Sequence, residues 1–258
     1  MWPDDRSDVP TRVRRAAQCA LEIQRNLHNA QLSESPKVAL SIKLGIGVGH
    51  VSIVHVGGVL GRIEYLATGD PLLQSFHAEH SAVAGQVMAS PEAWKILGRY
   101  FEADLLVDGV ALVHTCKEPV RKQSVRKAEG GAGDDLDEDR VFDIVRNYVP
   151  GAVIPFLNKA EEKWASELRR VSVIFVNLGM QEEDLLAIST PNGLKRCNDV
   201  MRAVQTAFYR FEGSINKFLM DDKGSTLIAV FGLPPLAHED DSARAILRYG
   251  AALSVSRR

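Results

Sequence analysis

Apolar and polar residues recur along the chain with two periods, and each period predicts a different element. From Thr11 to Leu32 apolar side chains return every three or four positions, which predicts a helix with one buried face. From Lys37 to Gly47 apolar and polar residues alternate, which predicts a strand. The chain is therefore expected to begin as a helix followed by a strand.

Glycine and proline mark the next element boundaries. Glycines separate the apolar stretches 51–56 and 62–67, which predicts a hairpin. Gly69-Asp70-Pro71 predicts a helix start, because Asp70 can cap free amides and Pro71 suits the first helical position. Ser90-Pro91 repeats this signal. Further strands are predicted at 86–88, 101–107 and 110–116.

The second half of the chain also alternates between strands and helices. Val171 to Val176 is a continuous apolar run, the pattern of a strand covered on both faces. Thr190-Pro191 predicts the start of a helix over 192–211. Two strands joined by the turn sequence DDKG are typical of a hairpin. These strands are predicted at 215–220 and 225–231, and a last helix from about 239 to the end.

A change of composition divides the chain. Residues 117–140 contain a basic stretch, three glycines and an acidic run, with almost no apolar side chain to bury. Because burial cannot offset the ordering entropy there, we expect a mobile linker. A partly helical connector, broken by Pro150 and Pro155, is expected over 141–168. The two folded segments are then 1–116 and 169–258.

Composition and charge exclude several classes of protein. The 258 residues are 45% hydrophobic, and 31 basic against 33 acidic side chains leave a formal charge of -2. This balance predicts neither nucleic-acid binding nor attraction to anionic lipid. Apolar runs are too short to span a bilayer. Three widely spaced cysteines form no zinc motif and no disulfide framework, so we expect a cytoplasmic protein.

Two stretches resemble one enzyme family in the same order. ELRRVSVIFVNL and GSINKFLMDDKGSTLIAVFGLPPLAHEDDSARAIL are similar to the start of the second cyclase domain of soluble, bicarbonate-responsive adenylyl cyclases, which are class III nucleotidyl cyclases. IKLGIGVGHVSIVHVGG and YLATGDPLLQSFHAEHSA resemble the later half of the first cyclase domain. The resemblance implies an α+β fold derived from a ferredoxin-like βαββαβ unit. It makes 1–116 the end of the first domain and 169–258 the start of the second, both incomplete.

The resemblance also implies a reaction. The complete enzyme would convert ATP to cyclic AMP and pyrophosphate in intracellular signalling, at a site shared by two cyclase domains. Two divalent ions, Mg²⁺ or Mn²⁺, would be held by carboxylates expected to precede Met1, so none of their ligands is expected in this chain. We therefore expect the chain alone to turn over ATP negligibly, with the missing portions of both domains as its partners.

The resemblance implies chemical roles for two residues of the second segment. Lys217 matches the lysine that contributes to adenine recognition, since an ammonium can donate to adenine N1. The alternative is an ordinary exposed lysine on an amphipathic strand. Asn177 stands where a metal-binding aspartate would fall, either as a vestigial metal position or as a polar residue that ends a strand. Asp221 and Asp222 form a carboxylate pair, but in a turn such residues are more often solvated.

The resemblance implies that the first segment forms one wall of a second, degenerate site, the place where bicarbonate binds in this family. Phe76 occupies the place of the anion-binding arginine, and a phenyl ring cannot pair with carbonate, which argues against bicarbonate control. Leu73 and His77 stand where an active domain would carry asparagine and arginine. The alternative is a helix that simply packs through its apolar side. The expected wall consists of Ala67, Leu73, Phe76 and His77.

Other functions stay open at this stage. A non-catalytic cyclase-like module that binds a nucleotide or a partner would also explain Asn177, Leu73 and Phe76. A truncated gene product that does not fold alone is a third possibility, because each half would leave strand edges uncovered. Gly45, Gly47 and Gly49 resemble a dinucleotide-binding loop, but a strand follows them rather than a helix, so we expect no phosphate there.

Overall fold

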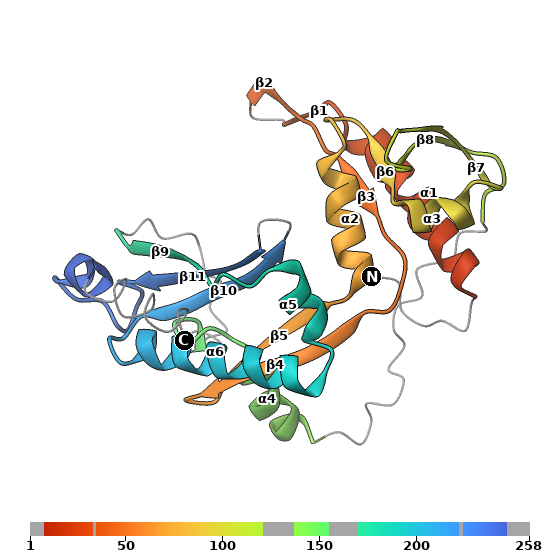
Figure 1. Ribbon diagram of the computed structural model, residues 1–258. Coiled ribbons are helices and arrows are strands. Elements are labelled where there is room, and N and C mark those ends of the chain that lie inside the picture. The colour runs from red at the N-terminus through yellow and green to blue at the C-terminus, as the bar shows by residue number, and fades with distance from the viewer. Residues whose placement is uncertain (1–7, 33–34, 121–136, 155–169, 222–223, 247–258) are drawn as a thin grey trace. The chain divides into compact units, whose positions relative to one another are not determined.

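The computed structural model describes residues 8–32, 35–120, 137–154, 170–221 and 224–246 (Figure 1). The chain divides into two compact units, one of Met1–Val51 and Gly69–Glu129, the other of Ser52–Thr68 and Gly130–Arg258. Each unit combines helices with an antiparallel or mixed sheet, so the predicted α+β class is confirmed. The predicted domain boundaries at 116, 140 and 168 stay predictions.

The first unit is a sheet covered on both faces. Its strand order is β3 (Leu44–Ile46), β6 (Val87–Ala89), β8 (Ala111–Cys116) and β7 (Phe101–Leu105), in which only β3 and β6 are parallel. Helices α1 (Val9–Leu27) and α3 (Pro91–Leu97) share a core with Val87 and Ala89. Met88 points the other way and packs with Ala78 of α2 (Asp70–His80), as the period of a strand requires.

Two glycines of the GIGVG segment bring α2 close to β3. A Cβ atom at Gly45 would overlap the backbone carbonyl of Ser75, and one at Gly47 would overlap that of Pro71. Gln74 then reaches across, and its Oε1 accepts a hydrogen bond from the Val48 backbone at 2.9 Å. These glycines therefore allow close packing of helix on strand.

The capping and periodicity signals in the sequence predicted some helix ends correctly and others incorrectly. Ser90 Oγ accepts from the Ala93 backbone at 3.1 Å, so the predicted cap of α3 is confirmed. The predicted capping role of Asp70 is wrong, because Gly69 is the cap residue and no side chain bonds there. The helix predicted to reach Leu32 ends at Leu27. Asn29 takes a left-handed φ of 59°, and β1 (Ala30–Leu32) then pairs with β2 (Ser35–Leu40).

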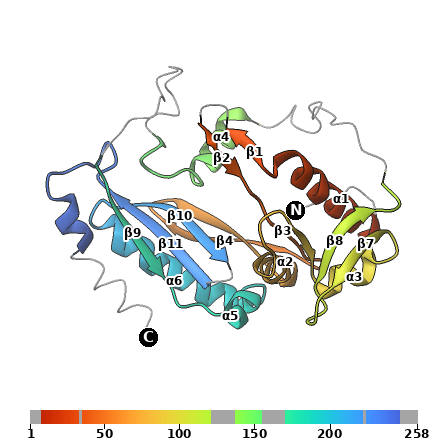
Figure 2. The same cartoon turned by 90° about the horizontal axis from the view of Figure 1, so that it is seen from above.

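The second unit contains a three-stranded antiparallel sheet with β11 in the centre (Figure 2). Its strands are β10 (Ser214–Asp221), β11 (Gly224–Phe231) and β9 (Ser172–Asn177). Helix α6 (Pro191–Tyr209) covers one face, and its Phe208 ring lies 6.0 Å from that of Phe231. Thr190 Oγ1 accepts from the Gly193 backbone at 3.2 Å, which confirms the predicted helix start.

Strand β9 is covered on one face only. Ile174 and Val176 are buried, whereas Val173 is 48% and Phe175 is 65% exposed. The expectation of a strand covered on both faces is therefore wrong. Continuous apolar sequence does not distinguish a fully buried strand from one with an apolar open face.

The hairpin of β4 (Ser52–Val59) and β5 (Arg62–Thr68) belongs to the second unit, where it lies beside α6 (Figure 1). Polar side chains of the helix bind its backbone. Asn198 Oδ1 accepts from Gly57 N at 2.9 Å, and Arg202 donates to Gly57 O at 3.0 Å. Gln205 accepts from Val59 N and donates to Arg62 O.

The segments between the predicted domains are only partly described. Helix α4 (Glu138–Arg146) begins inside the stretch expected to be a linker, while 121–136 and 155–169 lie outside the described residues. A short helix that the sequence pattern did not predict, α5 (Glu182–Ala187), precedes α6. The expected last helix is described over 241–246. None of the described helices is both long enough and apolar enough to cross a membrane.

Candidate functional site

The open face of the second unit's sheet brings together the polar residues singled out in the sequence. Lys217 of β10 pairs with Ile228 of β11, which in turn pairs with Phe175 of β9. Directly opposed residues of an antiparallel sheet project to the same face. Lys217 and Phe175 are both exposed. They lie two strand spacings apart, about 10 Å.

Asn177 lies one row further along this face. It pairs with Thr226 of β11, and its Oδ1 accepts a hydrogen bond from the Gly179 backbone at 2.7 Å. The side chain therefore stabilises the turn that follows β9. A neutral amide oxygen already bound to an N–H group is a poor ligand for a hard divalent cation.

Lys217 reaches the open face because of a β-bulge. The register shifts between Ile215 and Lys217, so that Ile215 is opposite Ala229 and Lys217 is opposite Ile228. Ile215 and Ala229 are buried under α6. An ammonium group beside a planar apolar surface can bind an aromatic heterocycle, with the ring on the apolar side chains and the amine at its edge.

The other carboxylates give no metal centre. Asp221 ends β10 opposite Gly224, and Asp222 lies outside the described residues. Among residues 8–32, 35–120, 137–154, 170–221 and 224–246, no three His, Cys, Asp or Glu side chains are grouped to hold a metal ion. Burial raises the pKa of the Cys197 thiol to about 11, so this cysteine is a core residue and not a nucleophile at neutral pH.

The residues expected to form a degenerate-site wall fall in both units. Leu73 and Phe76 of α2 are half-buried and His77 is exposed, all in the first unit. Ala67, on β5 opposite Ile53, belongs to the second unit. The α2 side chain that is fully buried is Ala78, a residue the helix pattern did not single out. The role of these residues as a wall stays a prediction.

Sequence reasoning missed the residues that fix the β4–β5 hairpin. Asn198, Arg202 and Gln205 share one face of α6, at the spacing of one and two helical turns. Polar residues at that spacing are typical of a solvated helix face, so the pattern carried no signal. Gln205 is nevertheless fully buried.

Comparison with known proteins supports the family resemblance. No protein-family profile matches the chain. Over 95% of its length, however, the chain is similar to class III nucleotidyl cyclases, which confirms the relationship inferred from the sequence.

The individual relatives are adenylate cyclases of one type. The chain is 25% identical over 267 residues to adenylate cyclase type 10 of Oryctolagus cuniculus and 24% identical over 274 residues to that of Homo sapiens. It spans only 16% of the length of each of these relatives. Among solved structures, the guanylate cyclase domain of RhGC from Catenaria anguillulae in complex with GTP matches with a TM-score of 0.37 and 19% identity. That match covers 42% of this chain and 63% of the other.

Proposed function

We propose that this chain is part of an adenylyl cyclase that converts ATP to cyclic AMP and pyrophosphate at a site shared by two cyclase domains. The similarity to adenylate cyclase type 10 along 95% of the chain is the observation that carries the proposal. The exposed position of Lys217 on the open sheet face supports it. Such an enzyme would act in the cytoplasm, in intracellular signalling.

Each residue of the open face has a role in this proposal. The Lys217 ammonium would donate a hydrogen bond to N1 of adenine. Guanine carries a proton on N1, so the same lysine would disfavour GTP. Phe175 and Ile228, in the same row, would provide the apolar surface beside the ring.

Divalent ions would be supplied through residues outside this chain. Mg²⁺ or Mn²⁺ neutralises the charge that develops on phosphate oxygens during such a reaction. Asn177 is neutral and already bound to Gly179, and the described residues hold no group of three metal-ligating side chains. The described residues therefore do not fit a resident metal ion, and we assign them no step that involves one.

The test uses the longest natural protein that carries this sequence, together with the 258-residue chain alone. In the longer protein, Lys217→Met should lower kcat/KM for ATP about tenfold or more, because a hydrogen bond from a charged donor is lost. The preference for ATP over GTP should fall with it. Lys195→Met, an exposed lysine of the same unit, is the matched control.

Two results would contradict the proposal. One is an ATP preference that is unchanged in Lys217→Met. The other is the absence of cyclic AMP formation from the longer protein with either Mg²⁺ or Mn²⁺. The isolated chain should form negligible cyclic AMP, and appreciable turnover by it would show that the site is not shared with another portion.

The second candidate is a non-catalytic module that binds a nucleotide or a partner. The neutral Asn177 and the apolar Leu73 and Phe76 favour it, since none of them can perform the chemistry of an active cyclase. Calorimetry distinguishes the two candidates. Saturable ATP binding by the longer protein, weakened by Lys217→Met and without any cyclic AMP formed, would favour the module.

A further inference from the structure

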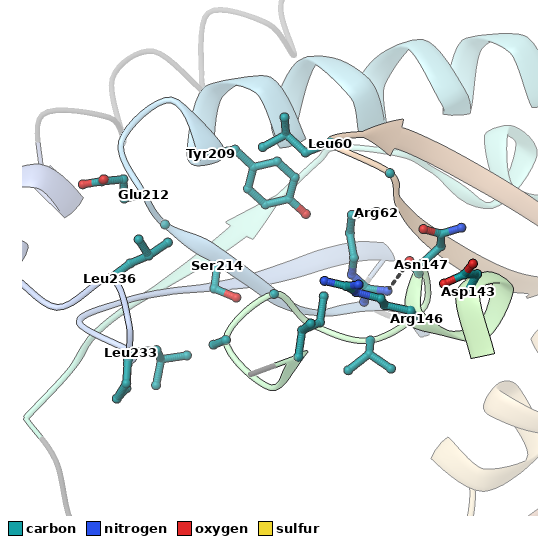
Figure 3. Close-up of a pocket in the computed structure, with 17 residues that line it drawn as sticks. Leu60, Arg62, Asp143, Arg146, Asn147, Tyr209, Glu212, Ser214, Leu233 and Leu236 are labelled. Atoms are coloured by element: carbon teal, nitrogen blue, oxygen red, sulfur yellow. Dashed lines mark hydrogen bonds between the residues drawn. The ribbon is translucent and has the colours of Figure 1, made fainter. Parts of the chain in front are cut away.

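The second unit contains a cavity of about 670 Å³ that Lys217 does not line (Figure 3). Three parts of the unit enclose it: the turn of the β4–β5 hairpin, the end of α4 with the residues up to 154, and the end of α6 with the start of β10 and residues 233–236. Its volume falls in the range of small-molecule sites. The cavity is therefore a candidate site separate from the proposed nucleotide contact.

Hydrogen bonds join these three parts around the cavity. The backbone N–H of Ile63 donates to the Asn147 carbonyl at 2.8 Å, which joins the hairpin to the end of α4. Gln205 Nε2 donates to the Arg62 carbonyl at 3.0 Å, which joins the hairpin to α6. The cavity is thus formed without a ligand, and a bound molecule would meet a low ordering cost.

The charged side chains that line the cavity balance one another. They are two arginines, Arg62 and Arg146, and two acids, Asp143 and Glu212. Arg62 is paired with Glu64 at 2.7 Å, and Glu212 is paired at 2.7 Å with an arginine that follows residue 241. Arg146 and Asp143 have opposite charges and are both exposed to water. A charged ligand would lose hydration here without gaining a counter-ion, so the lining favours an uncharged one.

Much of the remaining lining is apolar. It consists of Leu60, Val149, Ala152, Ile154, Leu233 and Leu236. Leu236 is 42% exposed although it borders a concave surface. Removing such a surface from water is favourable, so the lining favours a ligand with an apolar body.

Two hydroxyl groups add polarity without charge. In Figure 3 the hydroxyls of Tyr209 and Ser214 lie toward the cavity. Burial raises the pKa of Tyr209 to about 12, so its hydroxyl keeps its proton at neutral pH and can donate a hydrogen bond. Within the described part of the chain, neither hydroxyl is hydrogen-bonded to another residue. Both can therefore donate to an acceptor on a ligand.

We propose that this cavity binds an uncharged organic molecule that has an apolar body and a carbonyl group. The carbonyl oxygen accepts a hydrogen bond from the hydroxyl of Tyr209, with Ser214 as the second donor. The apolar body lies against Ile154, Leu233 and Leu236. A bound molecule joins the hairpin turn to the end of α6. Because Lys217 does not line the cavity, this proposal stands or falls separately from nucleotide binding.

The probe is prodan, an uncharged naphthyl ketone whose fluorescence shifts to shorter wavelength in apolar surroundings, titrated into the 258-residue chain. Three smaller competitors separate the contributions to binding: 2-acetylnaphthalene keeps the carbonyl group, 2-ethylnaphthalene lacks it, and 2-naphthoate carries a negative charge. We expect 2-acetylnaphthalene to displace prodan best. The hydrocarbon should bind about fivefold more weakly because one hydrogen bond is lost, and the carboxylate at least tenfold more weakly because its charge must be desolvated.

Two results with these ligands would overturn the proposal. One is the absence of saturable prodan binding. The other is displacement by 2-naphthoate or by 2-ethylnaphthalene that is as effective as displacement by 2-acetylnaphthalene, because the lining would then select neither an uncharged ligand nor a carbonyl group.

Two variants locate the binding site. Tyr209→Phe removes the donor and should weaken 2-acetylnaphthalene about fivefold while leaving 2-ethylnaphthalene unchanged. Tyr65→Phe, at an exposed tyrosine of the same unit outside the cavity, is the matched control and should change neither. Ser214→Phe places a ring in the cavity and should abolish prodan binding, with thermal unfolding as the check that the fold is kept. Unchanged binding of 2-acetylnaphthalene in Tyr209→Phe would refute the site, whatever Ser214→Phe shows.

Discussion

Replacement of Gln205 by methionine tests how the β4–β5 hairpin is held. Gln205 is 0% exposed, and its side chain binds two backbone groups of the hairpin. Oε1 accepts from Val59 N at 3.1 Å, and Nε2 donates to Arg62 O at 3.0 Å. Methionine has nearly the same volume but can form neither bond, so Gln205→Met removes the hydrogen bonds without opening a large cavity.

The expected loss follows from the two groups left without partners. An unsatisfied buried donor or acceptor costs about 1–3 kcal/mol, so two of them cost about 2–6 kcal/mol. Partial hydration of the hairpin edge lowers this sum, and we expect about 3 kcal/mol. Since each 1.4 kcal/mol corresponds to a factor of ten, opening of the hairpin should become roughly a hundredfold more frequent.

Hydrogen exchange measures this opening locally, which matters because a protein of two units need not unfold in a single step. Amide exchange in 52–68 should accelerate in Gln205→Met, whereas α3 in the other unit should keep its wild-type rate. Arg210→Met, at an exposed position just after α6, is the matched control. Wild-type exchange in 52–68 of Gln205→Met would refute the view that this side chain anchors the hairpin.

Three further predictions concern single positions. Gly57→Ala should also accelerate exchange in the hairpin, because Gly57 has a φ of 104° and an added Cβ would lie 2.5 Å from Gln205 Nε2. Ser90→Ala should lower the free energy of unfolding of the first unit by about 1 kcal/mol through loss of the α3 cap, measured by urea titration with Ser81→Ala as an exposed control. Burial raises the pKa of Glu64 above its ordinary value of 4.5, with Arg62 opposing the shift, so the folded protein binds a proton more tightly there than the unfolded chain. Stability should therefore decline as the pH rises from 4.5 through the raised pKa. Glu64→Gln should flatten that decline in thermal unfolding, and an equally steep decline in the variant would contradict the assignment.

The features predicted correctly from the sequence depend on short-range interactions. Ser90-Pro91 and Thr190-Pro191 mark helix starts because the hydroxyl binds a backbone amide three residues on. Glycines at the hairpin turn act through their own backbone freedom. Such signals lie within a few residues of one another, and the sequence displays them directly.

The features that were missed depend on partners far away in the sequence. The opening helix stops at Leu27 because β1 pairs with β2, although the apolar period continues to Leu32. The run from 171 to 176 has one open face because, among the described residues of its unit, α6 packs on the opposite face of that sheet and leaves Val173 and Phe175 exposed. The cavity gathers Arg62, Arg146 and Tyr209 from three elements, and each of them is unremarkable in its own segment.

The position of Lys217 depends both on its local sequence and on strand partners far away in the sequence. In a regular pairing that continued from Ile215 opposite Ala229, Lys217 would lie opposite Leu227, which is fully buried beneath α6. An ammonium there would lose its hydration without a partner. One extra residue, Asn216, shifts the register and turns Lys217 to the open face beside Ile228. The resemblance of INKF to a cyclase motif identifies the lysine, but the bulge makes it accessible, so the proposed adenine contact depends on a backbone irregularity that hydrophobic periodicity does not reveal.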